Sequence, residues 1–375
     1  MKRTEGISAP ATNSLSLDRL NRLYAFLIDA VDRELLPGAA IQLSHQGKLL
    51  EARAFGRRFP ATDAPPMQPD SIFLVASITK PVVVSGVMLL VERGHLLLDD
   101  PACRYVPEFG VNGKENITLR HLMTHTSGLP DMLPENQALR EAHAPMAEFI
   151  RRICTLTPNF AAGTNIQYQS AGIAILGEIA QRVSGLPLAD FLRREIFEPL
   201  GMHNTALGMA GLPAERLCQV NLPPEQVDTD WGWNSSYWRN LGAAWGGMFS
   251  TVGDLTRYLQ TFLNGGELDG VRVFGPATVA ALLRDQTTPM AAIPAEQKAM
   301  QSWGLGWRLA PATGWGYFGD LLTPGSFGHG GATGTVFWAD PVRELTCVLL
   351  TTQPAIWSER LLGRCSNLAA SCDIG

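Results

Sequence analysis

Both ends of this sequence carry strand patterns, and this feature constrains the fold more than any other. Near the N-terminus, apolar residues spaced three and four apart over 17–31 predict an amphipathic helix that begins near Ser16. Residues 39–58 then predict two strands that turn at Gln46-Gly47. The polar, proline-rich stretch over 57–71 predicts a surface loop. The chain therefore opens with a helix and a hairpin.

The C-terminal part of the chain returns to strands. Residues 334–341 and 344–352 predict an antiparallel pair that turns at Pro341-Val342, and residues 357–371 predict a final helix. Between the two ends, from about 115 to 255, helical stretches are broken by glycine and proline loops. The sequence therefore predicts an α/β fold of the α+β type. Its antiparallel sheet is flanked by helices and built from both chain ends, with a mainly helical region inserted.

The chain length sets the number of units. A length of 375 residues suffices for two or three units, or for one large domain with an insertion. We expect a discontinuous sheet domain from residues 1–115 and 256–375, and a mainly helical inserted domain from residues 116–255. With 46% hydrophobic residues and a net charge of −5, most of the chain is expected to fold.

Several classes of partner are excluded by the same sequence. There is no basic stripe for a nucleic acid to bind. The longest apolar run, over 81–98, meets Glu92 and Arg93 after about a dozen residues, so we expect no membrane span. Residues 1–14 carry charges but no apolar signal-peptide core, which predicts a cytoplasmic location.

The metal-binding residue types are present without a metal-binding pattern. The six cysteines show no zinc-ligand spacing, and we expect them to be buried free thiols. His121 and His125 are four residues apart but lack the Glu that follows the first His of a hydrolytic zinc helix. We therefore expect structural histidines and no metal ion.

The tetrapeptide Ser77-Ile78-Thr79-Lys80 opens an apolar stretch that predicts a helix over 77–94, with Pro81 in its first turn. Spacing of three places the Ser77 hydroxyl and the Lys80 amine on one face, within reach of a hydrogen bond. A serine hydroxyl needs a neighbouring base to become a nucleophile, and lysine can act as that base if burial lowers its pKa. On its own, such a tetrapeptide occurs by chance, and an exposed helix start is then the preferred interpretation.

Two further motifs follow in order. Tyr168-Gln169-Ser170 precedes an apolar helix, and His329-Gly330-Gly331 leads into a strand. Together with Ser77-x-x-Lys80, they resemble the three active-site elements of the serine β-lactamase and penicillin-binding protein superfamily. The likeness is strongest to the branch with class C β-lactamases and family VIII carboxylesterases, and it covers roughly residues 20 to 370.

The resemblance implies roles for the catalytic residues. Ser77 would be the acylated nucleophile, and Lys80 would orient and deprotonate it. Tyr168 would exchange protons with Ser77 and the leaving group, and the nearby cation would favour its phenolate form. The backbone N–H groups of Ser77 and Ala332 would form the oxyanion hole. The glycines at 330 and 331 would let the strand edge approach the acyl group closely.

The resemblance also implies substrate-binding positions. Ser170 could donate a hydrogen bond to substrate or Lys80, or could simply cap the following helix. His329, Gly330 and Gly331 stand where many relatives have Lys-Thr-Gly, so the attraction for a carboxylate is weaker here. His329 could also be a strand residue with a local hydrogen bond.

Tryptophans are concentrated in one segment of the predicted helical region. Trp231, Trp233 and Trp238 fall within nine residues. They could wall an apolar acyl or alcohol pocket, or could hold a long loop to the body of the protein.

These features favour a serine carboxylesterase that cleaves neutral esters with short to medium acyl chains through an acyl-enzyme on Ser77. The alternatives are a β-lactamase or D-amino-acid peptidase or amidase, an acyltransferase that uses the same acyl-enzyme, and a non-catalytic sensor. The proposed chemistry requires no metal or organic cofactor, and the expected partner is a small-molecule ester. The sequence assigns no oligomeric state.

Overall fold

A seven-strand antiparallel path forms the centre of the fold. The structure is a computed structural model that describes residues 15–61, 63–310 and 316–375. The strand order is β2-β1-β13-β12-β11-β10-β9, and β3 also pairs with β1. The strands of this sheet are β1 (Gly38–His45), β2 (Lys48–Leu49), β3 (Arg53–Gly56), β9 (Ser302–Trp303), β10 (Arg308–Leu309), β11 (Phe327–Gly331), β12 (Thr335–Asp340) and β13 (Leu345–Thr351). Both chain ends thus supply strands to one sheet, as the sequence predicts.

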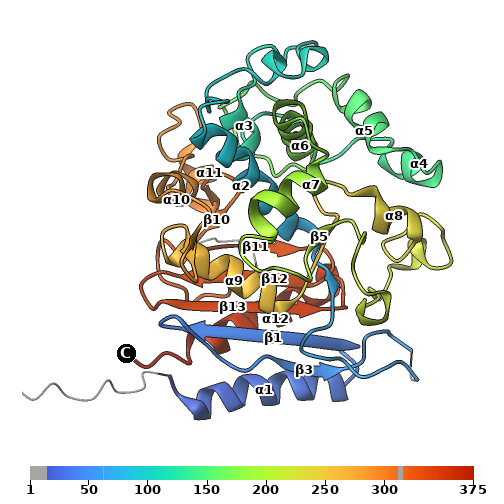
Figure 1. Ribbon diagram of the computed structural model, residues 1–375, viewed down its shortest axis with the longest axis vertical. Helices are drawn as coiled ribbons and strands as arrows, with labels where there is room; N and C mark the ends of the chain where they lie inside the picture. Colours follow the sequence, from blue (N-terminus) through green and yellow to red (C-terminus); the bar gives the residue numbers. More distant parts are fainter. Residues whose placement is uncertain (1–14, 62, 311–315) are drawn as a thin grey trace, which may run out of the picture.

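The helices divide between the sheet and the inserted region (Figure 1). Helix α1 runs along one face, and the helical region lies beyond the opposite face. The α-helices are α1 (Leu17–Asp32), α2 (Thr79–Glu92), α3 (Leu119–Met123), α4 (Asn136–Glu141), α5 (Met146–Ile153), α6 (Ala171–Ser184), α7 (Leu188–Leu192), α8 (Ser236–Leu241), α9 (Val252–Leu263), α10 (Pro276–Leu283), α11 (Ala295–Met300) and α12 (Ala355–Ala370).

Alternating side chains of the central strands feed two separate cores. In β12, Val336 and Trp338 pack into the core under α1 and α12, whereas Phe337 and Ala339 face the large core that contains α2 and α9. This alternation follows from the two-residue period of a strand. Because both faces of the sheet are covered, every residue of β1, β12 and β13 is buried. The division into domains at 115/116 and 255/256 stays a prediction.

The end elements match the sequence patterns closely. Ser16 caps α1, and its side chain accepts a hydrogen bond from the Arg19 N–H. Gln46 and Gly47 both have positive φ, 50° and 74°, as a tight hairpin turn requires. β12 and β13 pair antiparallel, with Phe337 opposite Val348. The strand expected after Gly47 is broken into β2 and β3, each of which pairs with β1.

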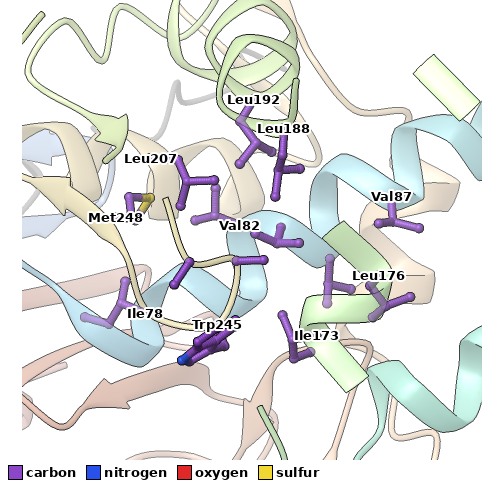
Figure 2. Packing of buried hydrophobic residues seen from close by; sticks show 14 of the residues in the cluster. Ile78, Val82, Val87, Ile173, Leu176, Leu188, Leu192, Leu207, Trp245 and Met248 are labelled. Atoms are coloured by element: carbon purple, nitrogen blue, oxygen red, sulfur yellow. The ribbon is translucent and has the colours of Figure 1, made fainter. Parts of the chain in front are cut away.

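Helix α2 is buried on all sides and fixes the start of the candidate site. Its residues from Thr79 to Leu90 are buried, because it lies between the sheet and helices α6, α7 and α10. Figure 2 shows Val82 and Val87 of α2 among side chains of α6, α7 and the short strands β5 (Ala206–Leu207) and β6 (Met248–Ser250). These two strands form a small sheet with β4 (Phe73–Leu74), which directly precedes the Ser77 segment.

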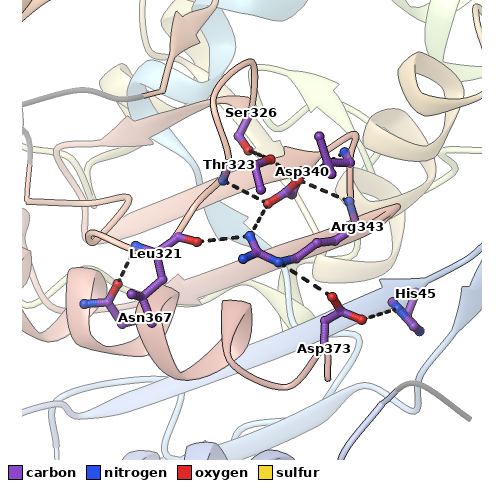
Figure 3. Close-up of polar contacts among 9 residues, drawn as sticks. His45, Leu321, Thr323, Ser326, Asp340, Arg343, Asn367 and Asp373 are labelled. Atoms are coloured by element: carbon purple, nitrogen blue, oxygen red, sulfur yellow. Dashed lines mark hydrogen bonds and ion pairs between the residues drawn. The ribbon is translucent and has the colours of Figure 1, made fainter. Parts of the chain in front are cut away.

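A cluster of polar side chains lies at the C-terminal end of β12. The buried Asp340 carboxylate accepts hydrogen bonds from the Thr323 N–H at 3.1 Å and from Arg343 Nη1 at 2.7 Å (Figure 3). Arg343 also contacts Asp373 at 3.6 Å, and Asp373 pairs with His45 Nε2 at 3.2 Å. The cluster therefore joins the first strand, the β12–β13 turn and the C-terminal segment. It will be called the Asp340 cluster.

Three smaller predictions can be compared with the structure. All six cysteines are free thiols, and five of them are buried; Cys103 is half-buried, because it lies in a surface turn. No helix in the described ranges is both long enough and apolar enough to cross a membrane. Residues 1–14, on which the predicted location rests, lie outside the described residues.

Candidate active site

Ser77 lies in a tight turn rather than in the α-helix that the sequence predicts to start there. Residues Ala76–Ile78 form a 3₁₀ turn, and α2 begins at Thr79, with Pro81 in its first turn as expected. The cause is Ala76, whose φ of 47° is left-handed and therefore strained for a residue with a Cβ. Ser77 is partly exposed, whereas Ile78, Thr79 and Lys80 behind it are buried. The turn thus presents one hydroxyl outward.

Lys80 lies directly behind Ser77. Its Nζ donates hydrogen bonds to Ser77 Oγ at 2.9 Å and to the Trp245 carbonyl at 2.9 Å. The side chain is 1% exposed. Burial lowers the pKa of Lys80 to about 7, while the negative charge of Asp131 opposes this change. An amine with this pKa can take up and release a proton near neutral pH.

Tyr168 completes a cluster of three side chains. Lys80 Nζ lies 4.8 Å from the centre of the Tyr168 ring, and the Tyr168 hydroxyl is hydrogen-bonded to Ser77. Burial raises the pKa of Tyr168 well above its ordinary value, although the Ser77 hydrogen bond acts in the opposite direction. The expectation of a phenolate is therefore wrong. About half of the Lys80 amines are protonated at pH 7, and the loss of hydration of Tyr168 outweighs this charge in setting the state of the phenol.

The segment 125–131 holds Tyr168 in place from one side. The Gln167 N–H donates to the His125 carbonyl at 2.9 Å, and the Gln169 N–H donates to His125 Nδ1 at 3.1 Å. The His125 ring lies 4.7 Å from that of Tyr168, and its φ is 60°. His121 Nδ1 instead accepts the Thr118 N–H at the start of α3. Both histidines are structural, as predicted, and His125 supports Tyr168.

Ser170 occupies the N-cap position of α6, but its side chain makes no capping hydrogen bond. Its N–H donates to the Asp131 carbonyl at 2.8 Å. The two hydrogen bonds that Lys80 donates go to Ser77 and Trp245. A role for the Ser170 hydroxyl toward substrate stays a prediction.

Strand β11 approaches the Ser77 turn very closely. A Cβ on Gly331 would lie 2.4 Å from the Val75 carbonyl and 2.2 Å from Thr335 Oγ1, so only glycine fits there. A Cβ on Gly330 would lie 2.6 Å from the ring of Tyr317. In the described ranges, neither the Ser77 nor the Ala332 backbone N–H has a backbone acceptor. These two amides flank the contact between the turn and the strand, which is where an oxyanion hole is predicted.

His329 is a buried strand residue. Its exposed fraction is 0%, and its Nδ1 lies 2.6 Å from the Gly330 carbonyl. Burial, reinforced by the charge of Lys80, lowers the pKa of His329 to about 3. The ring is therefore neutral at pH 7 and supplies no positive charge to the site.

Two of the three tryptophans enclose an arginine. The guanidinium carbon of Arg140 lies 5.0 Å from the Trp231 ring centre and 4.4 Å from that of Trp238. Arg140 Nη2 also donates to the Trp231 carbonyl at 3.1 Å. These contacts fasten the loop to α4, in line with the second alternative considered above. A substrate-binding role for Trp231, Trp233 and Trp238 stays a prediction.

Sequence reasoning missed Trp303 and Trp245. The Trp303 ring lies 4.2 Å from the His125 ring and 5.9 Å from that of His329. Trp245 reaches the site through its carbonyl, which holds Lys80, and its ring packs against Trp238 at 6.4 Å. The sequence signals only an excess of tryptophan. Because every residue has a backbone carbonyl, no residue type in the sequence could indicate that the acceptor for Lys80 lies at position 245.

The described ranges show no candidate metal-binding site. They contain no group of three or more His, Cys, Asp or Glu side chains that could hold a metal ion. The chemistry of the cluster comes instead from a hydroxyl, an amine and a phenol.

The comparisons with known proteins agree with this geometry. The family model described as Beta-lactamase matches residues 25–362. Esterase EstB from Burkholderia gladioli is 30% identical over 366 aligned residues, which cover 88% of this chain and 89% of the relative. Among solved structures, EstCE1, a hydrolase with promiscuous acyltransferase activity, has a TM-score of 0.76 at 19% identity, covering 95% of this chain and 98% of that one. A penicillin-binding protein homologue from Caulobacter crescentus has a TM-score of 0.76 at 22% identity, with 94% and 98% covered.

Proposed function

Because this chain belongs to the beta-lactamase family, whose serine hydrolases include esterases, we propose that it is a serine carboxylesterase. It would cleave esters with short to medium acyl chains through an acyl-enzyme on Ser77. The observation that carries this proposal is the hydrogen bond of 2.9 Å from the buried Lys80 amine to the partly exposed Ser77 hydroxyl. The proposed substrate is a small-molecule ester, and the proposed location is the cytoplasm.

In the proposed acylation step, Ser77 Oγ attacks the ester carbonyl. Lys80 accepts the hydroxyl proton, since its pKa of about 7 leaves a large neutral fraction at neutral pH. The negative charge that develops on the carbonyl oxygen would be held by the N–H groups of Ser77 and Ala332. The close contact of Gly331 with Val75 supports this pairing of amides.

In the proposed departure of the alcohol, Tyr168 is the proton donor. Its pKa is raised by burial, so the phenol carries its proton at neutral pH. The Tyr168 phenol would give this proton to the leaving alkoxide and recover one from the protonated Lys80 amine, which lies beside its ring. Water then attacks the acyl-enzyme, with the same groups acting in reverse order.

The surroundings of His329 favour a neutral ester over a substrate that carries a carboxylate. The neutral, buried imidazole adds no positive charge, and Gly330 has no hydroxyl to hold a carboxylate. A β-lactamase, a D-amino-acid peptidase or an amidase remains the alternative within the same mechanism. An acyltransferase would differ only in the acceptor that removes the acyl group from Ser77.

A direct comparison of substrates tests the proposal. Purified protein is offered p-nitrophenyl butyrate and nitrocefin side by side, and kcat/KM is measured for both. We expect the ester to be the better substrate. A higher kcat/KM for nitrocefin would instead make the protein a β-lactamase.

A labelling experiment tests the nucleophile itself. A fluorophosphonate probe should add to the peptide that contains Ser77, as seen by peptide mass mapping. The Ser77→Ala variant should lose both the label and about a thousandfold in kcat/KM. Wild-type protein that acquires no label on that peptide would favour a non-catalytic sensor. Label on another peptide would place the nucleophile elsewhere.

A further inference from the structure

The segment 125–131 brings an acidic residue next to Tyr168. This segment runs beside the segment 167–171 and ends at Asp131. Five hydrogen bonds join the two segments. Two of them place the backbone of Asp131 directly beside Ser170 and Ala171. The five are Gln167 N–H to His125 O, Gln169 N–H to His125 Nδ1, Ser127 Oγ to Gln169 Oε1, Ser170 N–H to Asp131 O and Ala171 N–H to Asp131 O.

The Asp131 carboxylate is exposed, and it forms no ion pair with any residue in the described ranges. Its charge nevertheless reaches two of the proposed catalytic groups. It favours the protonated form of Lys80 and disfavours the ionised form of Tyr168. A charge that acts on both of these groups also acts on a substrate bound beside them at Ser77.

A charge of the opposite sign, on Arg308, is arranged differently. Arg308 on β10 is 1% exposed, and its guanidinium stacks at 5.1 Å on the Trp303 ring. Arg308 donates to the Met300 carbonyl at 2.9 Å. Burial and the charge of Lys80 lower the pKa of His329 and His125, and the charge of Arg308 adds a smaller contribution in the same direction. Because Arg308 is buried behind Trp303, a substrate meets its field but not its hydrogen-bond donors. Asp131 is the exposed one of these two charges.

We propose that the Asp131 carboxylate makes this site prefer esters that carry a positive charge over their neutral and anionic isosteres. The inference deepens the proposed esterase function and rests on it. Two unit charges about 4 Å apart in water interact by about 1 kcal/mol, and less at larger distances or in salt. A cationic substrate should therefore gain roughly two- to fivefold in kcat/KM over its neutral isostere.

Two pairs of esters measure this preference directly. One pair has the charge in the alcohol: choline butyrate and 3,3-dimethylbutyl butyrate. The other has it in the acyl group: the p-nitrophenyl esters of 4-(trimethylammonio)butanoate and of 5,5-dimethylhexanoate. Within each pair a quaternary nitrogen replaces a carbon, so that shape is constant. We expect the cationic member of at least one pair to have the higher kcat/KM, and the ratio to fall as salt is added.

The variant that tests the residue is Asp131→Asn, which keeps the backbone carbonyl that accepts from Ser170 and Ala171. Its cation-to-neutral ratio should fall to about one, and the acidic limb of its pH profile should move to lower pH because Lys80 loses a negative neighbour. Asp131→Glu keeps the charge and should keep the ratio within about twofold. The matched control is Glu141→Gln, which removes an exposed carboxylate at the end of α4.

The outcomes separate this inference from the esterase proposal. An unchanged cation-to-neutral ratio in Asp131→Asn would overturn the role of Asp131. An equal fall of this ratio in Glu141→Gln would also overturn it, because the preference would then come from the net charge of the protein. If wild type hydrolyses none of the four esters, the esterase proposal fails. The Kd ratio for 3-(trimethylammonio)phenylboronic acid and 3-tert-butylphenylboronic acid, measured by calorimetry, then decides the charge preference without turnover.

Discussion

The two ends of strands β11 and β12 both bury charged groups, and they treat the charge in opposite ways. At one end, the Asp340 carboxylate accepts several hydrogen bonds and pairs with Arg343 (Figure 3). At the other end, near Gly331, the Lys80 amine is as deeply buried but has only a hydroxyl and a carbonyl as acceptors. Burial would raise the pKa of Asp340, but the bonds from Thr323 and Arg343 hold it below its ordinary value. Burial lowers the pKa of Lys80 to about 7.

The difference separates a charge that stabilises the fold from one that serves chemistry. A buried ion contributes to stability only when its hydrogen bonds are satisfied and a partner of opposite charge is close. The Asp340 cluster meets both conditions, so its carboxylate stays ionised. Lys80 meets neither fully, and its proton is therefore held loosely enough to be exchanged with Ser77.

Replacing Lys80 should produce the largest change in activity and little loss of stability. Lys80→Met removes the base while keeping a side chain of similar length, so kcat/KM for p-nitrophenyl butyrate should fall about a thousandfold. Because the variant no longer buries an amine, its free energy of unfolding in urea should equal or exceed that of wild type. Full activity in the folded variant would show that Ser77 is activated by another group.

Replacing Asp340 should do the reverse. Asp340→Asn removes the buried carboxylate that accepts from the Thr323 N–H and from the partly exposed Arg343, so the free energy of unfolding should fall by about 2 kcal/mol. Because the cluster lies at the opposite end of β12, kcat/KM at temperatures well below the unfolding midpoint should stay within about twofold of wild type.

Asp320→Asn, at an exposed position in the loop that carries Thr323, is the control for this change and should alter stability by less than about 0.5 kcal/mol. A large loss of kcat/KM in folded Asp340→Asn would mean that the two ends of β12 are coupled and do not act independently.

The sequence could predict those parts of the fold and site that depend on neighbours along the chain. Ser16 caps the helix that follows it, and Gln46-Gly47 makes the hairpin turn. Spacing of three brings Lys80 to Ser77, and this hydrogen bond forms even though Ser77 lies in a 3₁₀ turn. These signals depend only on residues close in sequence, so they hold independently of how the rest of the chain packs.

Contacts across the chain could not be predicted in the same way. The Trp245 carbonyl that holds Lys80 comes from 165 residues away. The ionisation of Tyr168 differs from the expectation because the motif indicates only a nearby cation, whereas the loss of hydration of the phenol depends on the whole surrounding core. The same holds for Trp231 and Trp238, whose rings enclose an arginine from α4.

The pH dependence of activity and of stability should distinguish the Lys80 end from the Asp340 end of the strands by a smaller effect. The kcat/KM of wild type should fall up to tenfold per unit below about pH 7, as Lys80 becomes protonated. For stability, the unfolded chain binds the Lys80 proton up to about pH 10.4 and the folded chain only up to about 7. The free energy of unfolding of wild type should therefore rise between these pH values relative to Lys80→Met.

Asp340 should act in a different pH window and with its own sign. Since its folded pKa is lowered, its contribution to stability is present above its unfolded pKa of about 3.9 and is lost as the pH falls further. Urea unfolding at a series of pH values measures both windows. If wild type and Lys80→Met change in parallel from pH 7 to 10, the Lys80 amine is not buried as described.

The smallest expected effect comes from two residues with strained backbone, one near Lys80 and one near Asp340. Ala76 and Glu344 both have left-handed φ, 47° and 48°, although neither is a glycine. Glycine at either position removes strain of about 1 to 2 kcal/mol but loses about 0.5 to 1 kcal/mol through the freedom of the unfolded chain. Both Ala76→Gly and Glu344→Gly should thus gain about 0.5 kcal/mol in stability. Only Ala76→Gly should lower kcat, by a few-fold, because a freer residue 76 lets the Ser77 hydroxyl and amide leave their orientation. Equal kcat values for the two variants would show that the strain before Ser77 serves the turn alone.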